Sequence, residues 1–199
     1  SGFGDLRAGV VGAHNACNAA VAALVGRWAG LNDDAIRAAL AVARGAEMRM
    51  ELRECGHVRV IDDAYNANPD SMLAGLRTLV DLSRGAGTPR RAVAILGDMG
   101  ELGPESDAMH RQVLAAALSE PAIAQIIVIG PRMAAASDRL RRAVDDAGDA
   151  RWIVLGAADD AGVREAAAHT QPGDLVLVKA SRSTGLDRVV RAILTMHQP

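Results

Sequence analysis

Residues 125–130 of this 199-residue chain read Gln-Ile-Ile-Val-Ile-Gly, a β-branched run that ends at a glycine. A second run, Leu-Val-Leu-Val at residues 175–178, is equally continuous. Strands covered by helices on both faces have such unbroken apolar sequences, whereas strands with one face in water alternate apolar and polar residues. The two runs therefore predict central strands of a parallel sheet.

The same unit occurs five times from about residue 57: a short apolar run, a turn and an amphipathic helical stretch. The runs cover residues 57–65, 91–97, 125–130, 151–156 and 174–180. Residues 49–54 alternate apolar and polar and precede Cys55-Gly56, so we expect an antiparallel edge strand joined by a hairpin. This alternation of strand and helix predicts an α/β fold with a Rossmann-like, doubly wound and mostly parallel sheet.

The first 46 residues have a different pattern, with two alanine-rich helices expected at about 14–29 and 33–43. Asn32 or Asp33 would cap the second helix. Two helices of this size cannot enclose a core, so they either pack on the α/β unit or belong to the end of another domain. We favour the second interpretation and divide the chain into domains at residues 1–46 and 47–199.

Composition narrows the class of protein. With 22 basic and 24 acidic residues and only four aromatic side chains, the chain offers no surface suited to nucleic acid. No stretch approaches the roughly 20 apolar residues of a membrane span, and no leader is visible, so we expect a cytoplasmic protein. Cys17 and Cys55 form no CxxC pair and are expected to be reduced thiols.

Ligands of such sheets collect at the carboxyl ends of the strands. After the first run, residues 62–71 read Asp-Asp-Ala-Tyr-Asn-Ala-Asn-Pro-Asp-Ser, the densest polar cluster in the chain. Asn68 and Pro69 suit the N-cap and first position of a helix, whose free N–H groups would face a phosphate. The alternative is that Asn68 only caps the helix and that Asp62 and Asp63 are solvated.

Two further clusters follow later strands. Residues 97–103 read Gly-Asp-Met-Gly-Glu-Leu-Gly, where the glycines allow positive φ and Asp98 and Glu101 could accept from a cation or an amine. A plain turn is the alternative, and the spacing is not the dinucleotide G-x-G-x-x-G. Lys179, the one lysine, is a candidate catalytic or anion-binding group; the alternative is a strand-end lysine that reaches solvent.

The first helix opens with Gly-Ala-His-Asn-Ala-Cys-Asn-Ala at residues 12–19. Helical spacing places His14, Asn15 and Asn18 on one face, and a carboxamide matches the donor and acceptor of adenine. The alternative is that Asn15 caps the helix. Lys179 is not preceded by glycine, so the chain has no Walker A motif, and the histidines show no metal-ligand spacing.

Taken in order, these stretches resemble the C-terminal part of the Mur ligases, the ATP-dependent amide-forming enzymes of peptidoglycan synthesis. The resemblance extends from residue 9 to nearly the end of the chain. The matching motifs are Gly12-x-His14-Asn15-x-x-Asn18-Ala19, Met48-Arg49-Met50-Glu51, Asp62-Asp63-x-Tyr65-Asn66-Ala67-Asn68-Pro69-x-Ser71-Met72, Leu96-Gly97-Asp98-Met99-x-Glu101-Leu102-Gly103 and Lys179-x-Ser181-Arg182.

The resemblance implies an activity. The most similar motifs belong to the member that uses ATP and Mg²⁺ to convert the carboxylate of UDP-N-acetylmuramoyl-tripeptide to an acyl phosphate, which the amine of D-alanyl-D-alanine then attacks. It implies that ATP is bound by Asn15, Asn18, Arg49, Asp63, Tyr65 and Asn68, with the first two asparagines on adenine and Asp63 on the ribose. It implies that the peptide substrates are bound by Asp98, Lys179, Ser181 and Arg182.

The sequence also departs from the family. Ala16-Cys17 replaces a strongly hydrophobic position, and Ala180 replaces a glycine. The family's P-loop, the modified lysine that helps bind magnesium and the UDP-sugar domain have no counterpart in these residues. We therefore expect a monomeric fragment that is inactive alone and holds no metal ligand. The same domain in another amide ligase, or a noncatalytic Rossmann-like binding module, are the alternatives.

Overall fold

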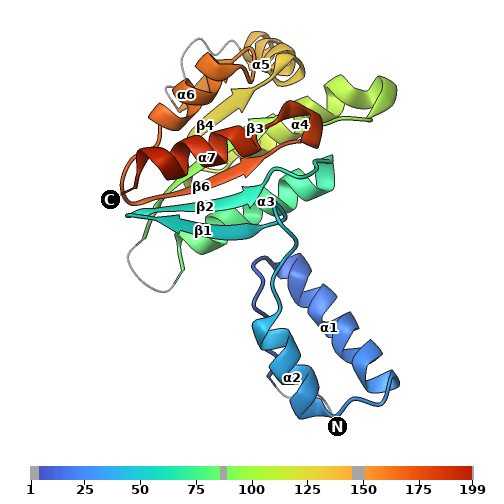
Figure 1. Cartoon of the computed structure of the whole chain (residues 1–199). Helices are drawn as coiled ribbons and strands as arrows, with labels where there is room; N and C mark the ends of the chain where they lie inside the picture. Colours follow the sequence, from blue (N-terminus) through green and yellow to red (C-terminus); the bar gives the residue numbers. More distant parts are fainter. Residues whose placement is uncertain (1–4, 86–88, 145–150, 199) are drawn as a thin grey trace.

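A computed structural model describes residues 5–85, 89–144 and 151–198. Its centre is a six-stranded sheet with the strand order β1-β2-β6-β3-β4-β5 (Figure 1). The strands are β1 (Glu51–Cys55), β2 (Val58–Asp63), β3 (Arg91–Gly97), β4 (Ile123–Ile129), β5 (Trp152–Leu155) and β6 (Asp174–Lys179). All neighbouring strands are parallel except β1, which pairs antiparallel with β2 at one edge. The predicted α/β class and its antiparallel edge are confirmed.

Helices cover both faces of the sheet. One face carries α3 (Pro69–Ser83), α4 (Ser106–Ser119) and α5 (Pro131–Val144), and the other carries α6 (Asp160–Ala168) and α7 (Asp187–Met196). Short 3-10 turns, η1 (Gly103–Glu105) and η2 (Arg182–Thr184), precede α4 and α7. Every residue of β6 is buried, as its unbroken apolar run predicts.

The hairpin between β1 and β2 has a two-residue turn, since Cys55 pairs with Val58. Gly56 takes φ +54° there, and a Cβ at this position would lie 2.6 Å from the carbonyl oxygen of His197. Both the left-handed conformation and the close approach require glycine.

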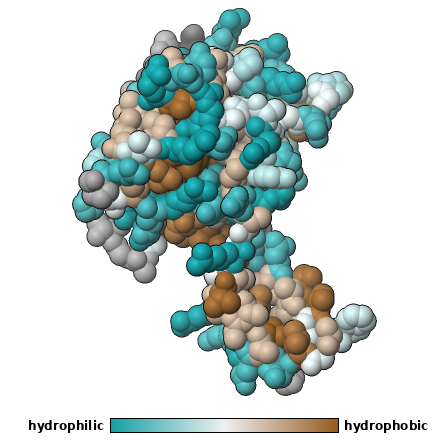
Figure 2. Space-filling view, viewed as in Figure 1, coloured by the Kyte–Doolittle hydropathy of each residue, from teal (hydrophilic) through white to brown (hydrophobic). Residues whose placement is uncertain are grey.

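The first two helices, α1 (Ala13–Trp28) and α2 (Asp33–Val42), pack on each other and project from the sheet (Figure 1). The predicted cap is correct, because the Asn32 side chain accepts a hydrogen bond from the Ala35 N–H. Few of the apolar side chains of α1 and α2 are buried, and Figure 2 shows apolar surface on this pair of helices. The exposed ones are Val21, Leu24, Val25, Trp28, Leu31 and Val42. None of the helices in the described ranges is both long and apolar enough to cross a membrane.

Candidate functional site

The path of the chain opens two crevices at the carboxyl edge of the sheet. Strands β2 and β3 lead into α3 and α4 on one face, whereas β6, which lies between them, leads into η2 and α7 on the opposite face. Ligands of open α/β sheets bind at such points, where neighbouring loops leave in opposite directions. We refer to the space beside β2 and β6 as the first crevice and to that beside β6 and β3 as the second.

A cavity of about 700 Å³ occupies the first crevice. It extends from the sheet to α1, and its lining includes all six residues that the resemblance assigns to ATP, together with Lys179: Asn15, Asn18, Arg49, Asp63, Tyr65 and Asn68. The volume lies within the roughly 300–1,000 Å³ range of small-molecule sites. Segments separated by more than a hundred residues thus meet at one cavity.

A buried ion pair forms the floor of this cavity. The Lys179 Nζ donates to Asp63 Oδ2 over 2.6 Å and to the Asn66 carbonyl over 3.1 Å. Asp63 Oδ1 also accepts from the Met50 N–H over 3.1 Å. Lys179 is 2% exposed and Asp63 8%. Burial of a charged group without a partner is costly, so each residue depends on the other for its place.

The register of the sheet explains this pair, because Asp63 and Lys179 are opposite each other on the adjacent parallel strands β2 and β6. Gly75 of α3 leaves room for the lysine stem, since a Cβ there would lie 3.2 Å from Lys179 Cδ. The prediction that the ammonium could emerge into solvent at the strand end is wrong. Lys179 turns under the segment after β2 and lines the same cavity as the six residues predicted for ATP. Its role toward the peptide substrates stays a prediction.

Arg49 and Tyr65 form one wall of the cavity. The Arg49 guanidinium lies 4.2 Å from the centre of the Tyr65 ring, a distance typical of a cation–π contact. The Tyr65 N–H donates to the Met48 carbonyl, which ties the two segments together. Met48 and Met50 take positive φ values of 58° and 52°, so the turn around Arg49 is an uncommon left-handed conformation for side-chain-bearing residues.

Asn68 caps α3 as predicted. Its Oδ1 accepts from the Ser71 N–H over 2.8 Å, and the Ser71 Oγ accepts from the Asn68 N–H over 3.1 Å. This reciprocal arrangement, with Pro69 at the first helical position, fixes the start of the helix at the cavity. Its role at a phosphate stays a prediction, since capping occupies the carboxamide oxygen.

On α1, the two asparagines lie side by side, and the Asn18 Nδ2 donates to Asn15 Oδ1 over 3.2 Å. The alternative in which Asn15 caps the helix is wrong, because the N-cap is Gly12 and no side chain caps this end. The side chain of His14 lies outside the described residues. The shared face predicted from helical spacing is therefore present for the two carboxamides.

In the second crevice, two of the predicted peptide-binding residues, Asp98 and Ser181, accept hydrogen bonds from backbone N–H groups. Asp98 Oδ1 and Oδ2 accept from the N–H groups of Met133 and Arg132, over 2.8 and 3.2 Å, at the start of α5. Ser181 Oγ accepts from the Gly100 N–H over 2.7 Å. The Arg182 guanidinium is directed to Met48. These contacts fasten the segments after β3 and β6 to each other and to α5.

The glycines of residues 97–103 are needed for different structural reasons. Of these glycines, only Gly103 takes a positive φ, +59°. The non-glycine residue Glu101 also has φ +59°. Gly97 instead provides space, because a Cβ there would lie 2.6 Å from the Ala180 Cβ. Of the two uses predicted for these glycines, positive φ is therefore found at Gly103 and close approach at Gly97, while Gly100 does not take a positive φ.

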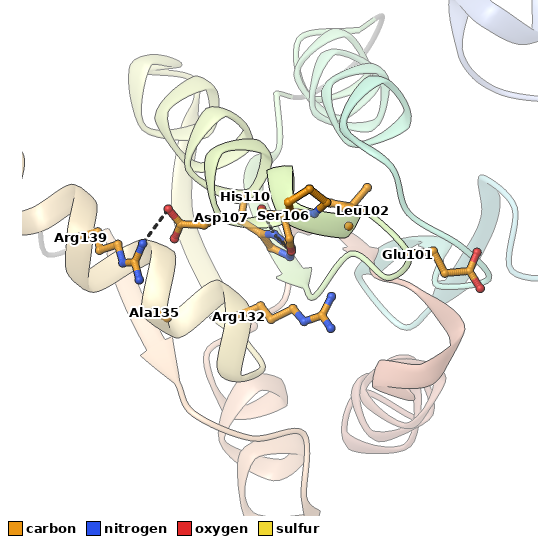
Figure 3. A pocket seen from close by; sticks show the side chains of 10 residues that line it. Glu101, Leu102, Ser106, Asp107, His110, Arg132, Ala135 and Arg139 are labelled. Carbon is orange, nitrogen blue, oxygen red and sulfur yellow. Dashed lines mark hydrogen bonds and ion pairs between the residues drawn. The ribbon is translucent and has the colours of Figure 1, made fainter.

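Two ionisable groups near these crevices are structural. Asp62 is buried rather than solvated, and burial raises its pKa above the ordinary 3.8, opposed by the hydrogen bond from Ala64 and the Arg53 guanidinium. His110 is buried between two bonds, with Nε2 accepting from the Met99 N–H and Nδ1 within 2.6 Å of the Ser106 carbonyl (Figure 3). In the described ranges, no group of three His, Cys, Asp or Glu side chains is placed to hold a metal ion.

Sequence reasoning missed Arg77, which lines the first crevice from α3. The sequence spacing could have indicated Arg77, because Asp70, Ala74 and Arg77 are separated by four and three residues and so share one helical face. All three line the cavity. Arg77 adds a cationic side chain on the α3 side of the cavity.

Comparison with known proteins agrees with this geometry. Residues 48–182 match the family described as Mur ligase, glutamate ligase domain. This chain belongs to the Mur ligase family. A UDP-N-acetylmuramoyl-tripeptide–D-alanyl-D-alanine ligase from Mycobacterium tuberculosis is 36% identical over 204 residues, which cover 96% of this chain but 39% of that relative.

Solved Mur ligase structures share the fold. MurF from Acinetobacter baumannii superposes with a TM-score of 0.76 at 25% identity, covering 96% of this chain and 39% of that one. MurF from Thermotoga maritima, solved in complex with ADP, gives a TM-score of 0.72 at 24% identity and covers 94% and 39%. The chain thus spans about 39% of the length of these Mur ligases.

Proposed function

We propose that this chain is the ATP-binding C-terminal part of a cytoplasmic ligase that joins D-alanyl-D-alanine to UDP-N-acetylmuramoyl-tripeptide in peptidoglycan synthesis. One observation carries the proposal: a single cavity gathers the six residues assigned to ATP from α1, the turn before β1 and the segment after β2. The 36% identical relative bears the name of this ligase, and the MurF of Thermotoga maritima was solved with ADP.

The residues of this chain would bind and orient the nucleotide, while ATP supplies the phosphoryl group that activates the tripeptide carboxylate. Asp63 would accept hydrogen bonds from the ribose hydroxyls. Because Lys179 and the Met50 N–H hold its two oxygens, its direction is fixed before the nucleotide arrives. A carboxylate oriented in this way loses little side-chain entropy on binding.

The remaining cavity residues suit the other parts of ATP. Asn15 and Asn18 would contact adenine, with Tyr65 beside the nucleotide. The N-terminus of α3, capped by Asn68, and the Arg49 guanidinium carry positive charge to the phosphate side. We assign Mg²⁺ to the rest of the ligase on the resemblance alone, since the modified lysine that helps bind the metal in the family has no counterpart in these residues.

We further propose that residues 1–46 are the end of a preceding ATPase domain and that the intact ligase is a monomer. The exposed apolar side chains of α1 support this assignment, since Trp28 is 89% exposed and Leu24 60%. An exposed apolar patch of this kind is typical of a surface that another part of a protein covers.

The test is substrate-dependent phosphate release by the full-length protein that carries these residues. We expect release from ATP only when UDP-N-acetylmuramoyl-tripeptide and D-alanyl-D-alanine are both present. Release supported by a single amino acid in place of the dipeptide would instead indicate another amide ligase. The absence of release with any amine, while ADP still binds, would indicate a noncatalytic binding module.

A further inference from the structure

The turn that carries Arg49 has an unusual backbone. Met48 and Met50, on either side of Arg49, take φ values of 58° and 52°. Residues with side chains avoid this left-handed region, so the conformation persists only where surrounding contacts fix it. Two such residues around one arginine therefore indicate that the surroundings determine the shape of the turn.

Hydrogen bonds hold the backbone of this turn at both ends. The Met50 N–H donates to Asp63 Oδ1, and the Met48 carbonyl accepts from the Tyr65 N–H, each over 3.1 Å. The Met48 N–H donates to Glu51 Oε2 over 3.3 Å. Asp63 and Tyr65 already belong to the residues assigned to ATP. The Glu51 side chain has no part in that assignment and does not line the first cavity.

The Glu51 carboxylate belongs to a charged cluster on β1 and β2. Glu51 lies directly opposite Asp62 on the neighbouring strand, and like charges at opposite positions destabilise a sheet. Arg53, on the same face of β1, joins them, because its Nη2 lies 3.0 Å from Glu51 Oε2 and 3.3 Å from Asp62 Oδ2. Asp62 is 1% exposed, so the cluster is anchored in the interior. Its effect is to hold the Glu51 carboxylate beside the turn.

The shape of the turn decides where the Arg49 guanidinium lies. The guanidinium is 4.2 Å from the centre of the Tyr65 ring, on the wall of the first cavity. Because left-handed residues flank Arg49 on both sides, a return of either to an ordinary φ would redirect its side chain. A guanidinium that is already in place loses less side-chain entropy when a ligand binds.

We propose that Glu51 is a positioning residue for the nucleotide. It holds the left-handed turn from which Arg49 reaches the phosphates, and it does not contact the nucleotide itself. The inference rests on the proposed function, in which Arg49 lies on the phosphate side of ATP. Glu51 acts through the reach of its oxygen to the Met48 N–H rather than through its charge. Shortening the side chain should therefore matter more than neutralising it.

The experiment measures ADP binding to the full-length ligase by calorimetry in Glu51→Asp and Glu51→Gln. Aspartate keeps the charge but is one methylene group shorter, so its oxygens fall short of the Met48 N–H. Glutamine keeps the length and a carbonyl oxygen that accepts this N–H. We expect Glu51→Asp to weaken ADP binding about fivefold or more and Glu51→Gln to bind within about twofold of the wild type.

Two controls separate positioning from a general loss of structure. Glu54→Asp is the matched variant on the same strand, since Glu54 is paired with Arg59 instead, and it should bind ADP as the wild type does. Adenosine lacks phosphates, so Glu51→Asp should leave adenosine binding unchanged. In an Arg49→Ala background, Glu51→Asp should have no further effect on ADP binding, because the two residues act in one chain of contacts.

The outcomes that would overturn the inference are specific. They are unchanged ADP binding in Glu51→Asp, weaker binding in Glu51→Gln than in Glu51→Asp, an equal loss of ADP and adenosine binding, or additive effects of Glu51→Asp and Arg49→Ala. A wild-type ligase that bound no ADP would refute the proposed function itself, so the two failures are distinguishable.

Discussion

The two crevices beside β6 lie at the same edge of the sheet, yet their polar side chains have different hydrogen-bond partners. In the first, Asp63 and Lys179 are paired with each other beneath a cavity of about 700 Å³ whose walls still present carboxamide, guanidinium and phenol groups. In the second, Asp98 and Ser181 accept backbone N–H groups. A polar cluster at a strand end therefore includes side chains that hold the fold, such as Asp98, and side chains that face a cavity, such as Arg49 and Tyr65.

The largest effect is expected from Lys179→Met, which removes the ammonium from the buried Asp63 carboxylate. Breaking a buried ion pair from one side costs about 3–5 kcal/mol, so the free energy of unfolding should fall by that amount. Urea denaturation at neutral pH measures it. Arg182→Met, an exposed site three residues later, is the matched control and should change stability by no more than about 0.5 kcal/mol.

The double variant Asp63→Asn, Lys179→Met sharpens this test, because it removes both charges. It should recover much of the stability lost in Lys179→Met. A Lys179→Met protein as stable as the wild type would mean that the ammonium reaches water, as in the alternative of a strand-end lysine that reaches solvent.

Gly97→Ala probes the packing of the second crevice. The added methyl group would lie 2.6 Å from the Ala180 Cβ and 2.9 Å from the Leu186 Cδ1. Overpacking of this kind costs about 1–3 kcal/mol, measurable as a lowered urea midpoint. Gly156→Ala serves as the control, since nothing lies within 4 Å of its Cβ position. Equal stability of the two variants would show that β3 and the segment after β6 can move apart at little cost in free energy.

Asp98→Ala should cost about 0.5–2 kcal/mol, the usual effect of losing a helix N-cap. Its two backbone acceptors at the start of α5 are lost together. Thermal unfolding of Asp98→Ala and of Asp138→Ala, an exposed change on the same helix, provides the comparison. A stability loss in both variants, or in neither, would remove Asp98 from the role of cap.

The smallest effect is expected from Asp62, where burial raises the pKa and the nearby Arg53, at 3.3 Å, opposes the shift. A raised pKa means that the fold favours the protonated form. The stabilisation is therefore complete below the ordinary pKa of 3.8 and is lost as pH rises through the higher value in the folded protein. The stability of the wild type relative to Asp62→Asn should fall as pH rises above 3.8. A stability difference that stays constant or increases with pH would contradict a raised pKa for Asp62.

Much of this architecture follows from local sequence. Continuous apolar runs such as residues 175–178 predict buried parallel strands, and Asn68-Pro69 predicts the start of α3, because periodicity and capping are local properties. The Lys179–Asp63 pair joins residues 116 positions apart and depends on strand order, which the sequence does not display. The same holds for Asp98, whose partners on α5 follow it by more than thirty residues.

ADP binding by the full-length ligase, followed by calorimetry, tests most directly whether the nucleotide binds in the first crevice, in the matched variants Asp63→Asn and Asp98→Asn. We expect Asp63→Asn to weaken ADP binding about tenfold or more, because a charged acceptor for the ribose is lost, and Asp98→Asn to bind within about twofold of the wild type. Circular dichroism verifies that both are folded, and Tyr65→Ala, on the exposed wall of the same cavity, provides a second variant that should also bind ADP more weakly. Unchanged affinity in Asp63→Asn and Tyr65→Ala, or a loss confined to Asp98→Asn, would contradict the assignment of the nucleotide to the first crevice.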